Sequence, residues 1–160
     1  MKIEYLREVY LALLIKTLTA SVFDESGWNR FYTHKRFYVR FLIWLLGRFN
    51  LIFVKLNIFD YASRNNGQDW PMFGFTMTGV KRMTFLKQSI INVIEQKITG
   101  DLFDARVWRG GSSILMKAVL NAFNDNRKVI LADSFEGMPK PSGIAGGFDL
   151  LDENIVFIKG

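Results

Sequence analysis

The chain has 160 residues, with 21 Lys and Arg against 15 Asp and Glu, one His and no Cys, and 49% of its residues are hydrophobic. This length suits one domain, and the apolar fraction suffices for a buried core, which excludes a wholly disordered chain. The lack of cysteine excludes a zinc ribbon, a Cys nucleophile and a disulfide scaffold. Because His34 is the single histidine, we expect neither a Ser-His-Asp triad nor a multi-histidine metal site.

The N-terminal residues do not have the pattern of a targeting signal. Glu4 and Glu8 lie where a secretory signal carries basic residues, and no small-residue cleavage site follows. The most apolar stretch, residues 41–59, is interrupted by Arg48 and Lys55, so it lacks the uncharged length of a spanning helix. We therefore expect a cytoplasmic protein.

Residues 26–59, the basic aromatic segment, contain no Asp or Glu and account for the whole net charge of +6. Three arrangements fit this composition: a helical hairpin packed on the rest of the protein, a helix on an anionic membrane contacted through residues 30–59, or a nucleic-acid platform. The long apolar runs favour a core or lipid, so no nucleic-acid partner is expected. The sequence leaves open whether the chain forms a homo-oligomer. The basic residues are Arg30, Lys35, Arg36, Arg40, Arg48 and Lys55.

A polar loop over residues 63–71 precedes a predicted helix over residues 76–98. Thr76 or Thr78 is expected to cap this helix, and Thr99-Gly100 to end it. Apolar residues recur at spacings of three and four and predict its inward face. They are Val80, Met83, Leu86, Ile90, Ile91, Val93 and Ile94.

The hydrophobic period then changes to that of a βαβ unit. Residues 102–107 predict a buried strand, residues 109–112 a tight turn, residues 113–123 a helix and residues 129–132 a second strand. The residues expected on the inward face of the helix are Ile114, Leu115, Ala118, Val119 and Ala122.

The turn after the first strand and an acid after the second predict a site for a nucleoside-containing cofactor. Asp133 follows Gly111 by 22 positions, which is the spacing at which an acid holds ribose hydroxyls. An ordinary strand-to-helix turn with a capping Asp fits the same pattern. The G-x-G-x-x-G fingerprint is absent, which disfavours a nicotinamide dinucleotide, and the late pair Gly110-Gly111 suits S-adenosylmethionine better.

Several ordered motifs resemble those of one family, the macrocin O-methyltransferases. Residues 99–111 (TGDLFDARVWRGG) resemble its GDLIETGVWRGG segment, and residues 132–139 (ADSFEGMP) resemble its ADSFxGLP segment. Upstream, residues 67–71 (GQDWP) and 76–83 (TMTGVKRM) are similar to its GxDWP and TMIGxxRL segments, and residues 6–11 to its first helix.

The resemblance implies a class I, S-adenosylmethionine-dependent, magnesium-assisted O-methyltransferase. Its acceptor would be a sugar hydroxyl of a glycosylated small molecule or polysaccharide. By the same resemblance, Thr76 and Met77 line the methionine end of the cofactor, Asp104 stands for the first-strand acid, and Asp133 with Ser134 holds the ribose. The full set of expected cofactor-binding residues is Thr76, Met77, Asp104, Gly110, Gly111, Asp133 and Ser134.

The chain departs from the family pattern at four places. Asp104 replaces a Glu, which shortens the acid by one methylene group. Ala105-Arg106 replaces a Thr-Gly pair, so a long cation should clash with a sulfonium ligand unless it turns away. Only residues 140–152 precede the strand-like residues 154–158, which suggests a deleted crossover helix. The sequence ends at Gly160, before the strands that carry the family's metal-binding acids and catalytic base. No catalytic residue or metal ligand is therefore assigned.

The expected fold is α/β: an incomplete doubly wound, Rossmann-like methyltransferase sheet preceded by an α-helical N-terminal region. The helical region covers residues 1–99 and the partial cofactor-binding domain covers residues 100–160, truncated after its third strand. We expect such a chain to be inactive alone. The alternative is a non-catalytic, basic amphipathic module that binds an anionic membrane or a partner protein.

Overall fold

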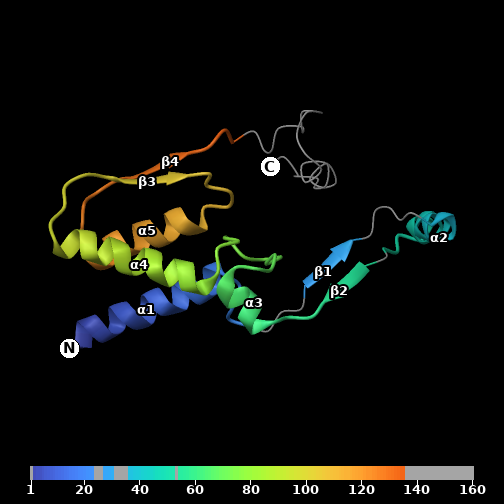
Figure 1. Cartoon of the computed structure of the whole chain (residues 1–160), viewed down its shortest axis with the longest axis horizontal. Helices are drawn as coiled ribbons and strands as arrows, with labels where there is room; N and C mark the ends of the chain where they lie inside the picture. The colour runs from blue at the N-terminus through green and yellow to red at the C-terminus, as the bar shows by residue number, and fades with distance from the viewer. Residues whose placement is uncertain (1, 24–26, 31–35, 53, 136–160) are drawn as a thin grey trace.

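The computed structural model describes residues 2–23, 27–30, 36–52 and 54–135, and it has a helical body with a small sheet and an arm that extends from it (Figure 1). The predicted strand at 154–158 and its glycine-rich approach lie outside these residues. The helices are α1 (Lys2–Leu18), α2 (Phe37–Arg48), α3 (Tyr61–Asn66), α4 (Val80–Glu95) and α5 (Gly111–Ala122), and the strands are β1 (Gly27–Arg30), β2 (Val54–Asn57), β3 (Leu102–Ala105) and β4 (Val129–Ala132).

Helix α5 lies at the centre of the body, between the β3–β4 sheet on one side and helices α1 and α4 on the other. A helix covered on several sides must be apolar around most of its circumference. Accordingly, Leu115, Met116, Val119 and Leu120 are all buried. The remaining strip of α5 consists of Ile114, Lys117 and Asn121, spaced by three and four residues and exposed. The prediction that Ile114 faces inward is therefore wrong, whereas Leu115, Ala118 and Val119 are confirmed as buried.

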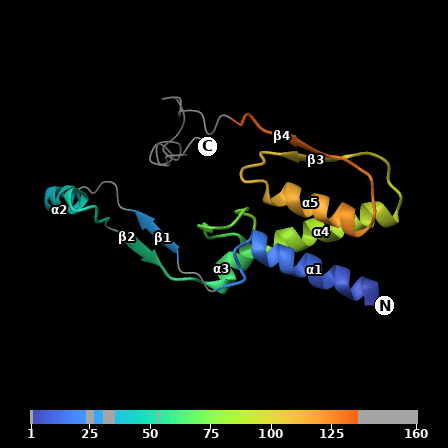
Figure 2. The same ribbon diagram turned by 180° about the vertical axis from the view of Figure 1, so that it is seen from behind.

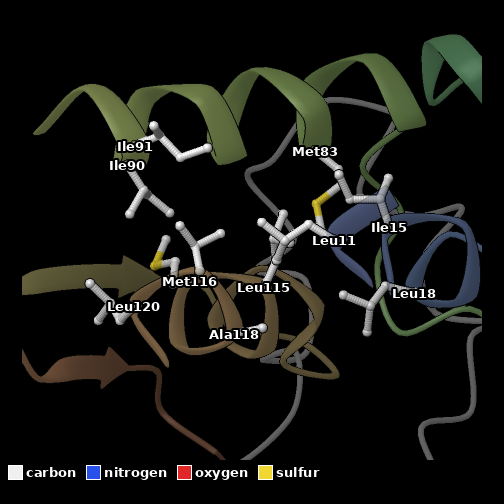
Figure 3. Close-up of a cluster of buried hydrophobic side chains, with 11 residues drawn as sticks. Leu11, Ile15, Leu18, Met83, Ile90, Ile91, Leu115, Met116, Ala118 and Leu120 are labelled. Carbon is white, nitrogen blue, oxygen red and sulfur yellow. The ribbon is translucent and has the colours of Figure 1, made fainter. Parts of the chain in front are cut away.

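The core forms where α1, α4 and α5 meet, as Figure 3 shows. Leu11 and Leu18 come from α1, Met83 and Ile90 from α4, and Leu115 from α5. Polar contacts at the rim join the same helices. The Lys87 Nζ of α4 donates to Glu8 Oε2 of α1 at 2.7 Å, and the Arg7 guanidinium of α1 lies 4.9 Å from the Phe123 ring centroid beside α5.

Strands β3 and β4 pair in parallel, with Leu102 opposite Val129 and Ala105 opposite Ala132. This pairing confirms the predicted βαβ unit, although β3 ends at Ala105 instead of residue 107. The strand stops because Arg106 adopts a left-handed backbone conformation, which cannot continue a strand. The prediction of a buried strand is wrong, because the sheet face away from α5 is uncovered among the described residues and the Phe103 side chain there is 61% exposed.

The arm differs from the predicted helical hairpin. Strands β1 and β2 pair antiparallel, with Gly27 opposite Asn57 and Arg30 opposite Val54, and they carry helix α2 at the far end. Figure 2 shows the same separation of α2 from the body when viewed from behind. Apolar periodicity alone did not distinguish two helices from one helix on a two-stranded ribbon, because short apolar runs fit both.

Helix α4 begins later and ends earlier than the predicted helix over residues 76–98. Gly79 occupies the N-cap position and neither Thr76 nor Thr78 caps the helix. The Thr76 hydroxyl oxygen instead accepts a hydrogen bond from the Thr78 N–H at 3.0 Å, inside the preceding loop. The helix ends at Glu95, before Gly100. Met83, Ile90 and Ile91 are confirmed as buried, and Val80, Leu86 and Ile94 pack against the core.

Among the helices of residues 2–23, 36–52 and 54–135, none has the length and apolar character needed to cross a membrane.

Candidate functional site

The turn between β3 and α5 has an unusual backbone. Arg106, Trp108 and Gly110 have φ values of 61°, 49° and 79°, all in the left-handed region. That region favours glycine because other residues bring their Cβ close to the carbonyl oxygen. The segment that this turn resembles has a glycine at position 106, and the positive φ gives the physical reason. The Arg106 side chain here is exposed.

Asp133 follows β4 and is tied to this turn. Its Oδ2 accepts a hydrogen bond from the Val107 N–H at 2.8 Å, and its Oδ1 accepts one from the Phe135 N–H at 3.3 Å. These backbone donors, Phe135 first, hold the pKa of the Asp133 carboxyl below its ordinary value of 3.8. Ser134 Oγ lies 3.5 Å from Asp133 Oδ1. Asp133 is thus an exposed carboxylate anion with capacity to accept further hydrogen bonds.

Asp104 lies one residue before the end of β3. Its Oδ2 accepts a hydrogen bond from the Ser113 hydroxyl in the first turn of α5. Ser113 is buried, so the pair fixes the carboxylate against the helix that follows the turn. A carboxylate near a helix N-terminus is electrostatically favourable because the terminal N–H groups carry partial positive charge.

A loop over residues 67–79 closes on itself at its base. Gly67 and Gly79 approach so closely that a Cβ added to Gly79 would lie 2.2 Å from the Gly67 nitrogen. Beside the base, the buried Arg64 donates from Nε to Asp69 Oδ2 at 2.5 Å and from Nη1 to the Thr19 carbonyl at 3.1 Å. Arg64 therefore links this 67–79 loop to the C-terminal end of α1.

The far part of the 67–79 loop crosses the first residue of α5. The Gly111 N–H donates to the Phe75 carbonyl oxygen at 3.0 Å, and the Phe75 N–H donates to the Leu18 carbonyl at 2.8 Å. A Cβ on Gly111 would lie 2.6 Å from the Phe75 oxygen and 2.8 Å from the Thr76 Cβ. Thr76 is buried, whereas the Met77 side chain is 39% exposed.

The structure therefore brings most of the expected site residues to one place. Asp104, Gly110, Gly111, Asp133 and Ser134 lie around the turn after β3, and Thr76 contacts Gly111. Met77 follows Thr76 in the same loop.

Sequence reasoning missed the residues that hold this arrangement together, namely Ser113, Arg64 and Arg109. Arg109 lies in the motif at residues 99–111, which was the available signal. Its side chain, however, donates to the backbone carbonyls of Met72 and Gly74, which no motif specifies.

The described residues do not fit a metal centre. In residues 2–23, 27–30, 36–52 and 54–135, no group of three or more His, Cys, Asp or Glu side chains is placed to hold a metal ion.

A parallel βαβ unit with a tight turn before its helix and an acid after its second strand is the arrangement of α/β proteins that bind ligands at the carboxyl ends of their strands. Residues 7–156 match the Macrocin-O-methyltransferase (TylF) family. The chain therefore belongs to the macrocin O-methyltransferase family.

Three curated relatives share this similarity. The chain is 30% identical over 180 residues to demethyldecarbamoylnovobiocin O-methyltransferase of Streptomyces niveus, covering 95% of this chain and 61% of that enzyme. It is 51% identical over 82 residues to 8-demethyl-8-(2,3-dimethoxy-alpha-L-rhamnosyl)-tetracenomycin-C 4'-O-methyltransferase of Streptomyces olivaceus, covering 51% of this chain and 31% of that enzyme. It is 37% identical over 83 residues to mycinamicin III 3''-O-methyltransferase of Micromonospora griseorubida, covering 51% and 33%.

The chain is also similar to a solved structure of an O-methyltransferase. The O-methyltransferase NovP is 30% identical and superimposes with a TM-score of 0.63, covering 88% of this chain and 48% of NovP. The chain thus spans between about a third and three fifths of the length of the curated relatives that it matches.

Proposed function

We propose that this chain binds S-adenosylmethionine at the turn after β3 and belongs to an O-methyltransferase that methylates a sugar hydroxyl of a glycosylated small molecule. Family membership over residues 7–156 supports the reaction class. The rhamnosyl group in the name of the Streptomyces olivaceus relative supports the sugar acceptor.

The observation that carries the proposal is the hydrogen bond between Asp133 and the Val107 N–H. It holds an ionised, exposed carboxylate beside the turn where parallel α/β sheets receive ligands. Asp133 with Ser134 would accept the ribose hydroxyls, and Asp104 with the residues of the 67–79 loop would face the amino-acid end.

S-adenosylmethionine supplies an electrophilic methyl group on its sulfonium when it is bound. The described residues of this chain would orient it, because in-line transfer requires the acceptor oxygen to lie close to the methyl carbon. The acceptor hydroxyl must also lose its proton to a base.

Calorimetric titration with S-adenosylhomocysteine tests the proposal. The wild-type chain should bind, and Asp133→Ala should lose at least about tenfold in affinity because a hydrogen bond to a charged group contributes about 1.5–3 kcal/mol. The matched control is Asp101→Ala. Asp101 also accepts a backbone hydrogen bond, from the Lys128 N–H at 3.0 Å, but it lies just before β3, at the opposite end of the strands. Equal binding by wild type and Asp133→Ala would refute the assigned site, as would no binding by the wild type.

A second candidate function is contact with an anionic membrane through α2. Among the described helices and strands, α2 contacts no other element. Phe37, Phe41 and Trp44 are 82%, 60% and 61% exposed, and the helix carries exposed arginines but no acid. An exposed apolar helix with basic residues and aromatic side chains suits the interface of anionic lipid.

Co-sedimentation with phosphatidylserine-containing and phosphatidylcholine vesicles tests the membrane candidate. We expect binding to the anionic vesicles only, weakened by salt. The double variant Arg40→Ala/Arg48→Ala should bind about tenfold or more weakly, because each basic residue contributes about 1 kcal/mol near an anionic surface. Lys81→Ala, an exposed position on α4, is the control. Absence of sedimentation with anionic vesicles would eliminate this candidate.

A further inference from the structure

Arg109, in the turn after β3, forms hydrogen bonds to a segment that is distant in sequence, the 67–79 loop. Its Nη1 donates to the carbonyl oxygens of Met72 and Gly74, both at 3.0 Å. Its guanidinium carbon lies 4.5 Å from the ring centroid of Trp108. That ring in turn meets Trp70 edge-on, with centroids 5.9 Å apart. Arg109 thus holds the 67–79 loop by two hydrogen bonds to its backbone, and Trp108 of the same turn adds an aromatic contact with Trp70.

The Gly111 N–H provides a second link between the same two segments. It donates to the Phe75 carbonyl oxygen, and the Phe75 N–H in turn donates a hydrogen bond to the Leu18 carbonyl at the end of α1. The 67–79 loop therefore lies between a rigid helix end and the start of α5. Arg109 is the side chain that forms hydrogen bonds from the turn to the loop residues before Phe75.

The same turn is also the attachment point of the proposed ribose acid. Val107, two residues before Arg109, donates its N–H to Asp133. Residues 107–111 thus contact both Asp133 and the loop that contains Thr76. A contact that fixes the loop on this turn therefore also fixes the position of Thr76 relative to Asp133.

We propose that Arg109 is a positioning residue: by holding the 67–79 loop on the turn after β3, it sets the half of the cofactor site around Thr76 in register with the half around Asp133. The inference rests on the proposed function, since it concerns the same cofactor. A ligand that spans both halves gains from their preorganisation, whereas a ligand that occupies only the ribose half gains nothing.

Two ligands distinguish these halves. S-adenosylhomocysteine carries an adenosine and an amino-acid end, and 5'-methylthioadenosine lacks the amino-acid end. Calorimetry on Arg109→Ala should show S-adenosylhomocysteine binding weakened by at least about tenfold and methylthioadenosine binding changed by less than about twofold. Arg109→Lys, which keeps the charge but not the fork of donors, should fall between wild type and Arg109→Ala. Arg82→Ala, at an exposed position of α4, should behave like the wild type.

Hydrogen exchange on the same proteins provides a readout without ligand. Amides of residues 72–76 should exchange faster in Arg109→Ala, while those in the core helices α4 and α5 should not change. An equal loss of both ligands, unchanged S-adenosylhomocysteine affinity, or unchanged exchange in the loop would each overturn the positioning role. A wild-type chain that binds neither ligand would overturn the proposed function and this inference together, whereas an equal loss of both ligands overturns the inference alone.

Discussion

Arg106 has a φ of 61°, a conformation that costs a non-glycine residue about 1–2 kcal/mol. Replacing it by glycine removes this strain but adds about 0.5–1 kcal/mol of unfolded-state entropy. We expect Arg106→Gly to raise the free energy of unfolding by roughly 0.5–1 kcal/mol in urea titration.

The matched control for Arg106→Gly is the same substitution inside a helix. Arg82 lies in α4, where glycine lowers stability by about 1 kcal/mol. The two substitutions should thus have opposite signs. A loss of stability in Arg106→Gly would mean that the arginine side chain makes a stabilising contact that outweighs its backbone strain.

The titration of Asp133 offers a second test at the scale of one residue. Hydrogen bonds, from the Phe135 N–H first and also from the Val107 N–H, hold its pKa below 3.8. Its stabilising contribution is therefore fully present above pH 3.8 and is lost as the pH falls through the lower folded pKa. Carboxyl-carbon NMR should show a midpoint below 3.8, and Asp133→Asn should remove that transition. A midpoint at or above 3.8 would contradict the two backbone hydrogen bonds.

At the scale of elements, the 67–79 loop and helix α5 meet without space for a side chain at residue 111. Gly111→Ala would place a Cβ 2.6 Å from the Phe75 carbonyl oxygen, which is backbone and cannot rotate away. We expect a loss of about 1–3 kcal/mol in the free energy of unfolding. The loop should also shift, so the midpoint temperature of thermal unfolding and the affinity for S-adenosylhomocysteine should both fall.

Gly47→Ala is the control for Gly111→Ala. Nothing lies within 4 Å of a Cβ at position 47, near the end of α2. This substitution should leave stability unchanged or raise it by up to about 1 kcal/mol, because alanine favours helix. Tolerance of both substitutions would show that the close approach at Gly111 is not needed.

The boundaries of some helices and strands were predictable from the sequence, and others were not. Strand β4 was predicted at its observed bounds because a short apolar run is bordered by polar residues on both sides. The start of α4 was not, because Thr76 and Thr78 are good capping residues in isolation. Packing of the 67–79 loop against α5 takes the Thr76 region out of the helix, and that contact joins residues far apart in sequence.

At the scale of the whole molecule, the body and the arm should respond differently to mutation. Leu115 is fully buried between α1 and α4, so Leu115→Ala should cost about 2–5 kcal/mol. Trp44 lies on α2, which contacts no other described element, so Trp44→Ala should change stability by less than about 0.5 kcal/mol. Urea unfolding of the two variants measures the difference.

Hydrogen exchange extends this test to the arm. If body and arm are independent, Leu115→Ala should accelerate exchange in α1, α4 and α5 and leave that of α2 as in the wild type. Coupled acceleration in α2 would show that arm and body unfold together.

The sequence by itself determined the βαβ unit, the inward residues Leu115 and Val119 and the family, and it nominated the candidate site residues. These features depend on local periodicity, turn chemistry and short motifs, which are read from neighbouring residues. The tertiary structure decided that α5 is covered on two sides, that the arm is a ribbon with one helix, and that Arg109 and Gly111 join the 67–79 loop to the turn after β3. Those features depend on contacts between separate segments of the chain, such as those of Arg109 and Gly111 with residues 72–75, more than thirty positions away, and a local pattern carries no information about which distant backbone groups will meet.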